Sequence, residues 1–160
     1  MRPSILVPRI LWAALLGSQA LYVALIVLGV LEAPSEPADP IMLPALGAVA
    51  LGTSVASFVV PRILHRSAIA QALPAVQHQG SGELAVIRAA YQAGMSPFIV
   101  SLALSEAVAL YGLVLAALGF PVLYCLPFSG LGAMLTLVRF PTESAFLAPF
   151  EERLGRSVVG

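Results

Sequence analysis

Four long apolar runs dominate this sequence and constrain its fold more than any other feature. They cover residues 10–31, 41–60, 98–118 and 122–138. The hydrocarbon core of a bilayer is about 30 Å thick, and a helix needs about 20 residues to cross it. Because 59% of the residues are hydrophobic and only 10% are charged, the chain lacks the polar surface of a soluble domain. We therefore expect an all-α integral membrane protein, a single domain built as a four-helix bundle.

The arginines predict how this bundle is oriented. All eight basic residues are arginines, and they fall before the first run, between the second and third, and after the fourth. The loop after the first run carries Glu32, Glu36 and Asp39 instead. Because cytoplasmic loops are rich in arginine and lysine, we expect both termini, the 61–96 loop and the 139–160 tail in the cytoplasm. This pattern favours a multi-pass protein of a bacterial inner or plasma membrane.

The segments outside the bilayer are expected to form short helices. In the 61–96 loop, Leu84, Ile87 and Tyr91 recur at helical spacing, which indicates an amphipathic helix on the inner membrane interface. The alternative is a docking surface for a cytoplasmic partner. The tail is expected to form another short helix, and the side chains that would dock it are Phe146, Leu147 and Phe150.

Glu106 is the only charged residue inside the four apolar runs. It lies about eight residues, or about 12 Å, from the cytoplasmic end of the third run. A carboxylate at that depth costs at least a few kcal/mol, so we expect a protonated carboxyl that hydrogen-bonds to other helices. Gln19, Ser54 and Ser129 lie at a similar depth on the other three runs. The sequence therefore predicts a polar layer formed by these four side chains, which are also the candidate ion-binding residues.

The segment around Glu106 also has a recognisable pattern. Residues 104–117 read Leu-Ser-Glu-Ala-Val-Ala-Leu-Tyr-Gly-Leu-Val-Leu-Ala-Ala. This segment resembles the carboxylate-bearing helix of the rotary ATPase proteolipid, the c subunit, in which a membrane-embedded glutamate is commonly followed by Tyr-Gly-Leu. The resemblance is limited to this one helix. It implies that Glu106 binds a translocated proton or sodium ion, and it assigns no chemical role to Tyr111 or Gly112.

Two functional hypotheses follow from these features. The first is a structural or accessory subunit of a membrane complex, and the second is a proton- or cation-translocating, proteolipid-like unit that uses Glu106. Small residues recur at helix-packing spacing within the runs, so assembly into a homo-oligomer is a further alternative. No phosphate loop, dinucleotide fingerprint, HExxH or GxSxG motif occurs, so we expect no enzyme, no metal site and no cofactor. The formal net charge is zero, so a nucleic-acid partner is not expected.

Overall fold

The computed structural model describes residues 5–31, 39–78 and 83–154, and these residues form five helices and no strand. The helices are α1 (Leu6–Val27), α2 (Met42–His78), α3 (Glu83–Ala117), α4 (Val122–Val138) and α5 (Glu143–Leu154). α1, α2 and most of α3 are long and apolar enough to cross a membrane, and α4 adds a fourth candidate if it is joined to α5, which is bent from it by 60°. The all-helical prediction is confirmed for the described residues, whereas the four-span arrangement stays a prediction.

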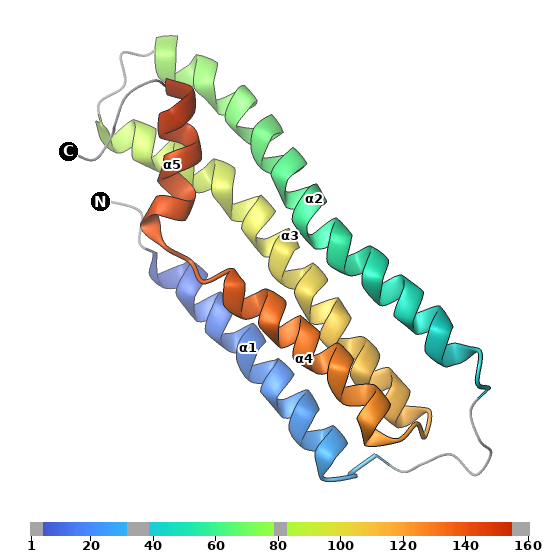
Figure 1. Ribbon diagram of the computed structural model, residues 1–160. Helices are drawn as coiled ribbons and strands as arrows, with labels where there is room; N and C mark the ends of the chain where they lie inside the picture. The colour runs from blue at the N-terminus through green and yellow to red at the C-terminus, as the bar shows by residue number, and fades with distance from the viewer. Residues whose placement is uncertain (1–4, 32–38, 79–82, 155–160) are drawn as a thin grey trace.

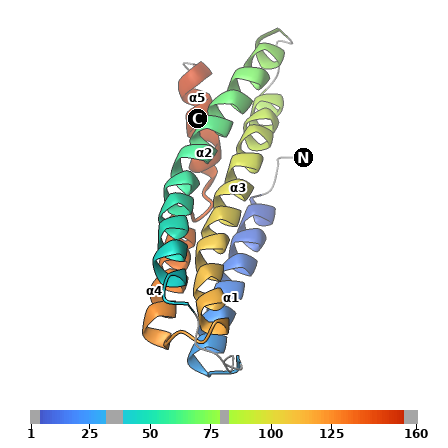
Figure 2. The same cartoon turned by 90° about the vertical axis from the view of Figure 1, so that its right-hand side faces the viewer.

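α3 is the central helix of the structure and packs against all four of the others. α1 and α4 lie side by side along α3, and α2 runs along another side of it (Figure 1 and Figure 2). α2 and α3 have 37 and 35 residues, against 22 in α1 and 17 in α4. At about 1.5 Å per residue, α2 and α3 are about 50–55 Å long, well beyond the thickness of a bilayer core.

The extra length of α2 and α3 forms a helical head, which we define as residues 62–78, residues 83–97 and α5. Figure 1 shows α5 packed against this end of α3. The sequence predicted a span that begins at residue 98 and a separate interfacial helix before it, which is wrong because α3 continues through Pro97, as α2 continues through Pro61. The buried side chains of the head are Ile69, Val76, Val86, Ile87, Ala90, Tyr91, Ala93, Phe146, Leu147 and Phe150.

Burial of these side chains explains why the helices continue. Of the stripe predicted to face a membrane surface, Ile87 and Tyr91 are buried in the head, whereas Leu84 is exposed. Tertiary packing of this kind outweighs the local cost of an interior proline. Tyr91 stacks on Phe146 with ring centroids 5.2 Å apart, and Phe98 meets the same ring edge-on. The predicted docking of the tail helix through Phe146, Leu147 and Phe150 is confirmed.

Two glycines end helices with left-handed backbone conformations. Gly29 has a φ of 62° and follows α1, and Gly119 has a φ of 82° and follows α3. Beyond each glycine, a backbone N–H bonds back to the last helical turn, from Val30 to the Leu25 carbonyl and from Phe120 to the Leu115 carbonyl. Only glycine adopts this conformation without strain. The reversal after Gly119 lets α4 begin at Val122 and end at Val138, as predicted.

Two further glycines allow α3 and α4 to approach closely. A Cβ on Gly132 would lie 2.6 Å from the Ala109 Cβ and 2.8 Å from the Ser105 carbonyl oxygen. A Cβ on Gly112 would lie 2.6 Å from the Cys125 carbonyl oxygen. By contrast, Gly17 and Gly52, which belong to small-residue spacings in α1 and α2, have open space where a Cβ would go. Glycines therefore permit a close approach of helix backbones at the α3–α4 crossing but not at these positions of α1 and α2.

We expect Gly132→Ala to destabilise the protein by about 1–3 kcal/mol, because the added methyl group meets backbone atoms that cannot rotate away. Gly130→Ala is the matched control on the same helix, since its Cβ would meet nothing within 4 Å. Alanine there should be neutral or stabilising by up to about 1 kcal/mol. Unfolding in mixed micelles, followed through the fluorescence of Trp12, the single tryptophan, measures both changes. Equal stability of the two variants would contradict the close crossing.

Candidate functional site

The carboxyl group of Glu106 is the centre of a polar cluster that joins α3 to α1. Ser18 Oγ lies 2.7 Å and Tyr22 Oη 2.6 Å from its Oε1, and Gln19 Nε2 donates to its Oε2 at 3.0 Å. Ser18, Gln19 and Tyr22 occupy one face of α1 because residues three and four apart are neighbours on a helix. Three donor groups therefore hold the carboxyl group of Glu106 against α1.

Gln19 extends this cluster to α4. Its side chain is fully buried, and the second hydrogen of its Nε2 is donated to Thr136 Oγ1 at 2.9 Å. The indole N–H of Trp12 bonds to the Thr136 carbonyl at 2.8 Å, and its ring meets Phe140 edge-on at 5.0 Å. Through Gln19 and Thr136, the cluster around Glu106 holds α1, α3 and α4 together.

Two details of this cluster allow it to hold a proton as well as a charge. The Ser18 hydroxyl also lies 2.7 Å from the Leu15 carbonyl, so its single hydrogen has two acceptors when Glu106 is ionised. A proton on Glu106 could be donated to Ser18 Oγ, which would free the Ser18 hydrogen for Leu15. In addition, Gln19 Oε1 is buried and has no hydrogen-bond partner. The surroundings of Glu106 therefore include one hydroxyl with two acceptors and one unpaired amide oxygen.

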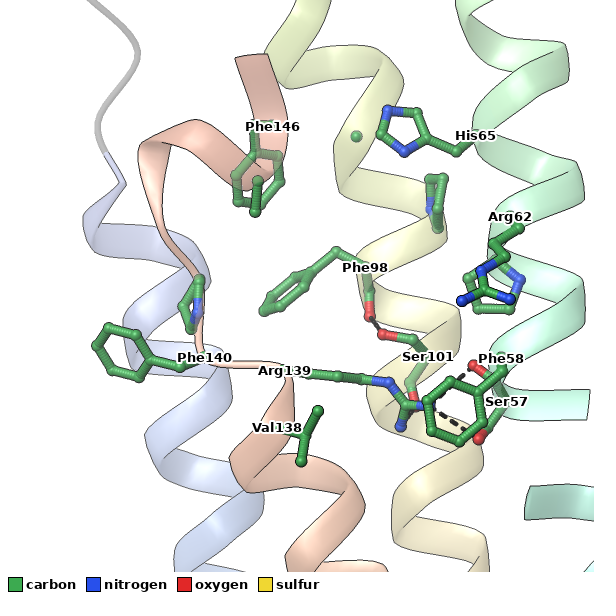
Figure 3. Close-up of a pocket in the computed structure, with 15 residues that line it drawn as sticks. Ser57, Phe58, Arg62, His65, Phe98, Ser101, Val138, Arg139, Phe140 and Phe146 are labelled. Carbon is green, nitrogen blue, oxygen red and sulfur yellow. Dashed lines mark hydrogen bonds between the residues drawn. The ribbon is translucent and has the colours of Figure 1, made fainter. Parts of the chain in front are cut away.

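A second polar cluster surrounds Arg139, the residue after α4. Its guanidinium donates to the Ser57 carbonyl at 2.9 Å, to Ser57 Oγ at 2.8 Å and to the Ser101 carbonyl at 3.2 Å, and it also contacts Ser105 Oγ. Figure 3 shows the side chain extending from the end of α4 toward α2, where it lies over the Phe58 ring at 4.8 Å. Arg139 therefore joins α4 to both α2 and α3.

Pro61 explains why an arginine binds at this place on α2. Proline has no backbone N–H, so Pro61 cannot donate the helical hydrogen bond that Ser57, four residues earlier, would accept. The Arg139 guanidinium supplies a donor to that carbonyl instead. An unpaired carbonyl inside an apolar bundle costs about 1–3 kcal/mol. The contact with Arg139 avoids this cost for the Ser57 carbonyl, which Pro61 leaves without its helical donor.

The two clusters form one polar layer across α1–α4. Ser105 and Glu106 are adjacent on α3, and Thr136 and Arg139 are about one turn apart at the end of α4. Gln19 and Glu106, two members of the predicted layer, are hydrogen-bonded to each other. Ser54 and Ser129 lie outside the layer, because Ser54 bonds to the Ala50 carbonyl of its own helix and Ser129 bonds to the Ala109 carbonyl at the α3–α4 crossing.

Several members of this layer were missed by the sequence prediction. Ser18 and Tyr22 could have been predicted, because they share one helix face with Gln19. The contacts of Arg139 could not, because no pattern in the residues next to it in the sequence indicates its partners. The members not predicted are Ser18, Tyr22, Ser57, Ser101, Ser105, Thr136 and Arg139.

The residues that carry the resemblance to the proteolipid helix have structural contacts in this protein. Tyr111 Oη lies 3.3 Å from Thr53 Oγ1 on α2, and Gly112 provides room for α4. Within the described ranges, no group of three or more His, Cys, Asp or Glu residues is arranged to hold a metal ion. A comparison of the chain with protein-family models, with curated proteins and with solved structures found no match in any of the three.

Proposed function

We propose that this chain is a multi-pass membrane protein with four spans and both ends in the cytoplasm, and that it is a structural or accessory subunit of a larger membrane complex. Its long apolar helices and their exposed apolar faces support the membrane placement. Side chains exposed on these faces include Ile10, Leu21, Leu51, Val55, Leu123 and Met134. The arginines of the described chain lie at the end of the bundle that carries the head, as expected for its cytoplasmic side.

The observation that carries the structural role is the way the polar layer is bonded. The hydrogen bonds of Glu106 and Arg139 go to residues on neighbouring helices, and between them they link all four candidate spans. Polar residues used in this way fix the positions and rotations of helices in lipid. The head supports an accessory role, because it is continuous with two spans and presents an exposed helical surface outside the bilayer.

Membrane placement is tested by labelling single cysteines in a Cys125→Ala background. We expect Asp39→Cys to react with an impermeant maleimide in intact cells, and Ser67→Cys to react only after the membrane is permeabilised. Both positions are exposed; Asp39 lies just before α2, and Ser67 lies in the part of α2 that belongs to the head. Labelling of Ser67→Cys in intact cells would contradict the proposed orientation.

Purification from native membranes with a mild detergent tests the accessory role. We expect one partner to copurify at a fixed ratio and to be lost from the double variant Arg66→Glu/Arg88→Glu. Both arginines are exposed on the head, so the variant should remain folded. A strictly monomeric protein with no partner at a fixed ratio would count against this role.

A proton- or cation-translocating unit is the second candidate, and the proton-holding geometry at Glu106 favours it. The shared Ser18 hydrogen and the unpaired Gln19 Oε1 would let Glu106 take up and release a proton with little rearrangement. This candidate predicts that Glu106→Gln abolishes proton movement while Glu106→Asp retains part of it. The structural role predicts that Glu106→Gln is nearly harmless, because an amide keeps both an acceptor and a donor.

A further inference from the structure

A cavity lies where the helical head meets the rest of the bundle, between α2, α3 and the α4–α5 junction (Figure 3). Its volume is about 320 Å³, at the lower end of the range of small-molecule sites, which is about 300–1,000 Å³. Its apolar wall includes the rings of Phe58, Phe98 and Phe146. This wall suits the glycerol and upper acyl region of an amphipathic molecule.

The polar part of the cavity wall is basic. Arg62, His65 and Arg139 line the cavity, and no acidic residue is among the residues that line it. Figure 3 shows Arg62 and His65 on α2 and Arg139 below them. A site with two arginines and no carboxylate attracts a negatively charged group.

The hydrogen-bonding capacity of these groups is not used up. Four of the five N–H groups of Arg139 are taken by oxygens of Ser57, Ser101 and Ser105, which are all neutral, so its charge has no counter-charge in the described chain. Arg62 is exposed and forms no hydrogen bond or ion pair with the residues that the structure describes. His65 Nε2 is buried without a hydrogen-bond partner.

We propose that this cavity binds the phosphate headgroup of an anionic membrane lipid, with Arg62 and His65 contacting the phosphate and Arg139 contributing its positive charge. The position of the cavity favours a lipid over a free phosphate, because the apolar parts of α2 and α4 end beside it and their exposed faces continue into the proposed bilayer. Basic pockets between helices on the cytoplasmic side are typical sites for such headgroups. The inference rests on the proposed membrane placement, which cysteine labelling tests independently.

The experiment uses the full-length protein in a neutral detergent and native mass spectrometry to count bound lipids. Phosphatidylglycerol is the anionic probe, phosphatidylcholine is the neutral one, and glycerol phosphate is the headgroup without chains. We expect one phosphatidylglycerol to bind tightly and Arg62→Gln to weaken it about fivefold, as expected for one basic residue near an anionic lipid. His65→Leu keeps the apolar bulk of the ring and should also weaken binding.

Arg66→Gln is the matched control, because Arg66 is exposed on α2 one turn from Arg62 and does not line the cavity. We expect it to bind phosphatidylglycerol as the wild type does, and unchanged Trp12 emission should show that each variant is folded. Three results would each overturn the proposal: equal binding of the two lipids, equal losses for Arg62→Gln and Arg66→Gln, or displacement of the lipid by glycerol phosphate at an equal concentration.

Discussion

Arg139→Met should lower the free energy of unfolding by about 2–3 kcal/mol, although it only removes a charge from the end of an apolar helix. Methionine has a similar length and is compatible with an apolar surface, but it cannot donate a hydrogen bond. The variant would leave the Ser57 carbonyl and the serine hydroxyls without their charged partner. Unfolding in mixed micelles, followed by far-ultraviolet circular dichroism, measures the loss. Arg66→Met is the control and should change stability by less than about 0.5 kcal/mol, because Arg66 is exposed.

A double-mutant cycle with Pro61 tests the physical reason for this loss. Pro61→Ala restores a backbone N–H that can bond to the Ser57 carbonyl within α2. In the Pro61→Ala background, Arg139→Met should therefore cost about 1 kcal/mol less than in the wild type. If the two losses are equal, Arg139 does not compensate for the missing N–H of Pro61.

Glu106→Ala should be the other strongly destabilising change, with an expected loss of about 2–4 kcal/mol. Ser18, Gln19 and Tyr22 would each lose an acceptor inside the bundle, and Gln19 is fully buried. Glu106→Gln should cost about 1 kcal/mol or less. Its amide oxygen can accept from Ser18 and Tyr22, and a flip of the Gln19 amide brings the unpaired Oε1 against the new NH₂ group.

Ser54→Ala is the control for the Glu106 series, because Ser54 lies at the predicted depth but bonds only to its own helix. It should change the free energy of unfolding by less than about 0.5 kcal/mol. The same micelle unfolding assay compares the three variants. Equal losses for Glu106→Ala and Glu106→Gln would contradict a role that depends on hydrogen bonds.

Part of the polar layer could be predicted from the sequence, because depth in the apolar runs is a local property. Counting residues from the ends of the apolar runs predicted that Gln19 and Glu106 lie at a similar depth. The two side chains are hydrogen-bonded to each other. Depth does not give the rotation of a helix, however. Ser54 is at a similar level, but its short hydroxyl side chain bonds to a carbonyl of its own turn, as is common for serine in helices.

The helical head and the role of Arg139 could not be predicted for a different reason. The apolar spacing of Leu84, Ile87 and Tyr91 is the same whether a helix faces a membrane surface or another helix. In the folded chain Ile87 and Tyr91 are buried in the head and Leu84 is exposed, which the spacing does not predict. Arg139 was interpreted only as a marker of the cytoplasmic side. Its pairing with Ser57 depends on Pro61, which is far away in the chain, so no local pattern around Arg139 reports it.

Proton flux into liposomes tests most directly whether the polar layer holds helices together or moves an ion. Wild-type and Glu106→Gln protein would be reconstituted at equal density, and an imposed membrane potential would drive protons inward past a trapped pH-sensitive dye. A structural role predicts that the two preparations give the same flux as liposomes without protein. A flux that requires the wild-type protein, is abolished by Glu106→Gln and is partly retained by Glu106→Asp would contradict it.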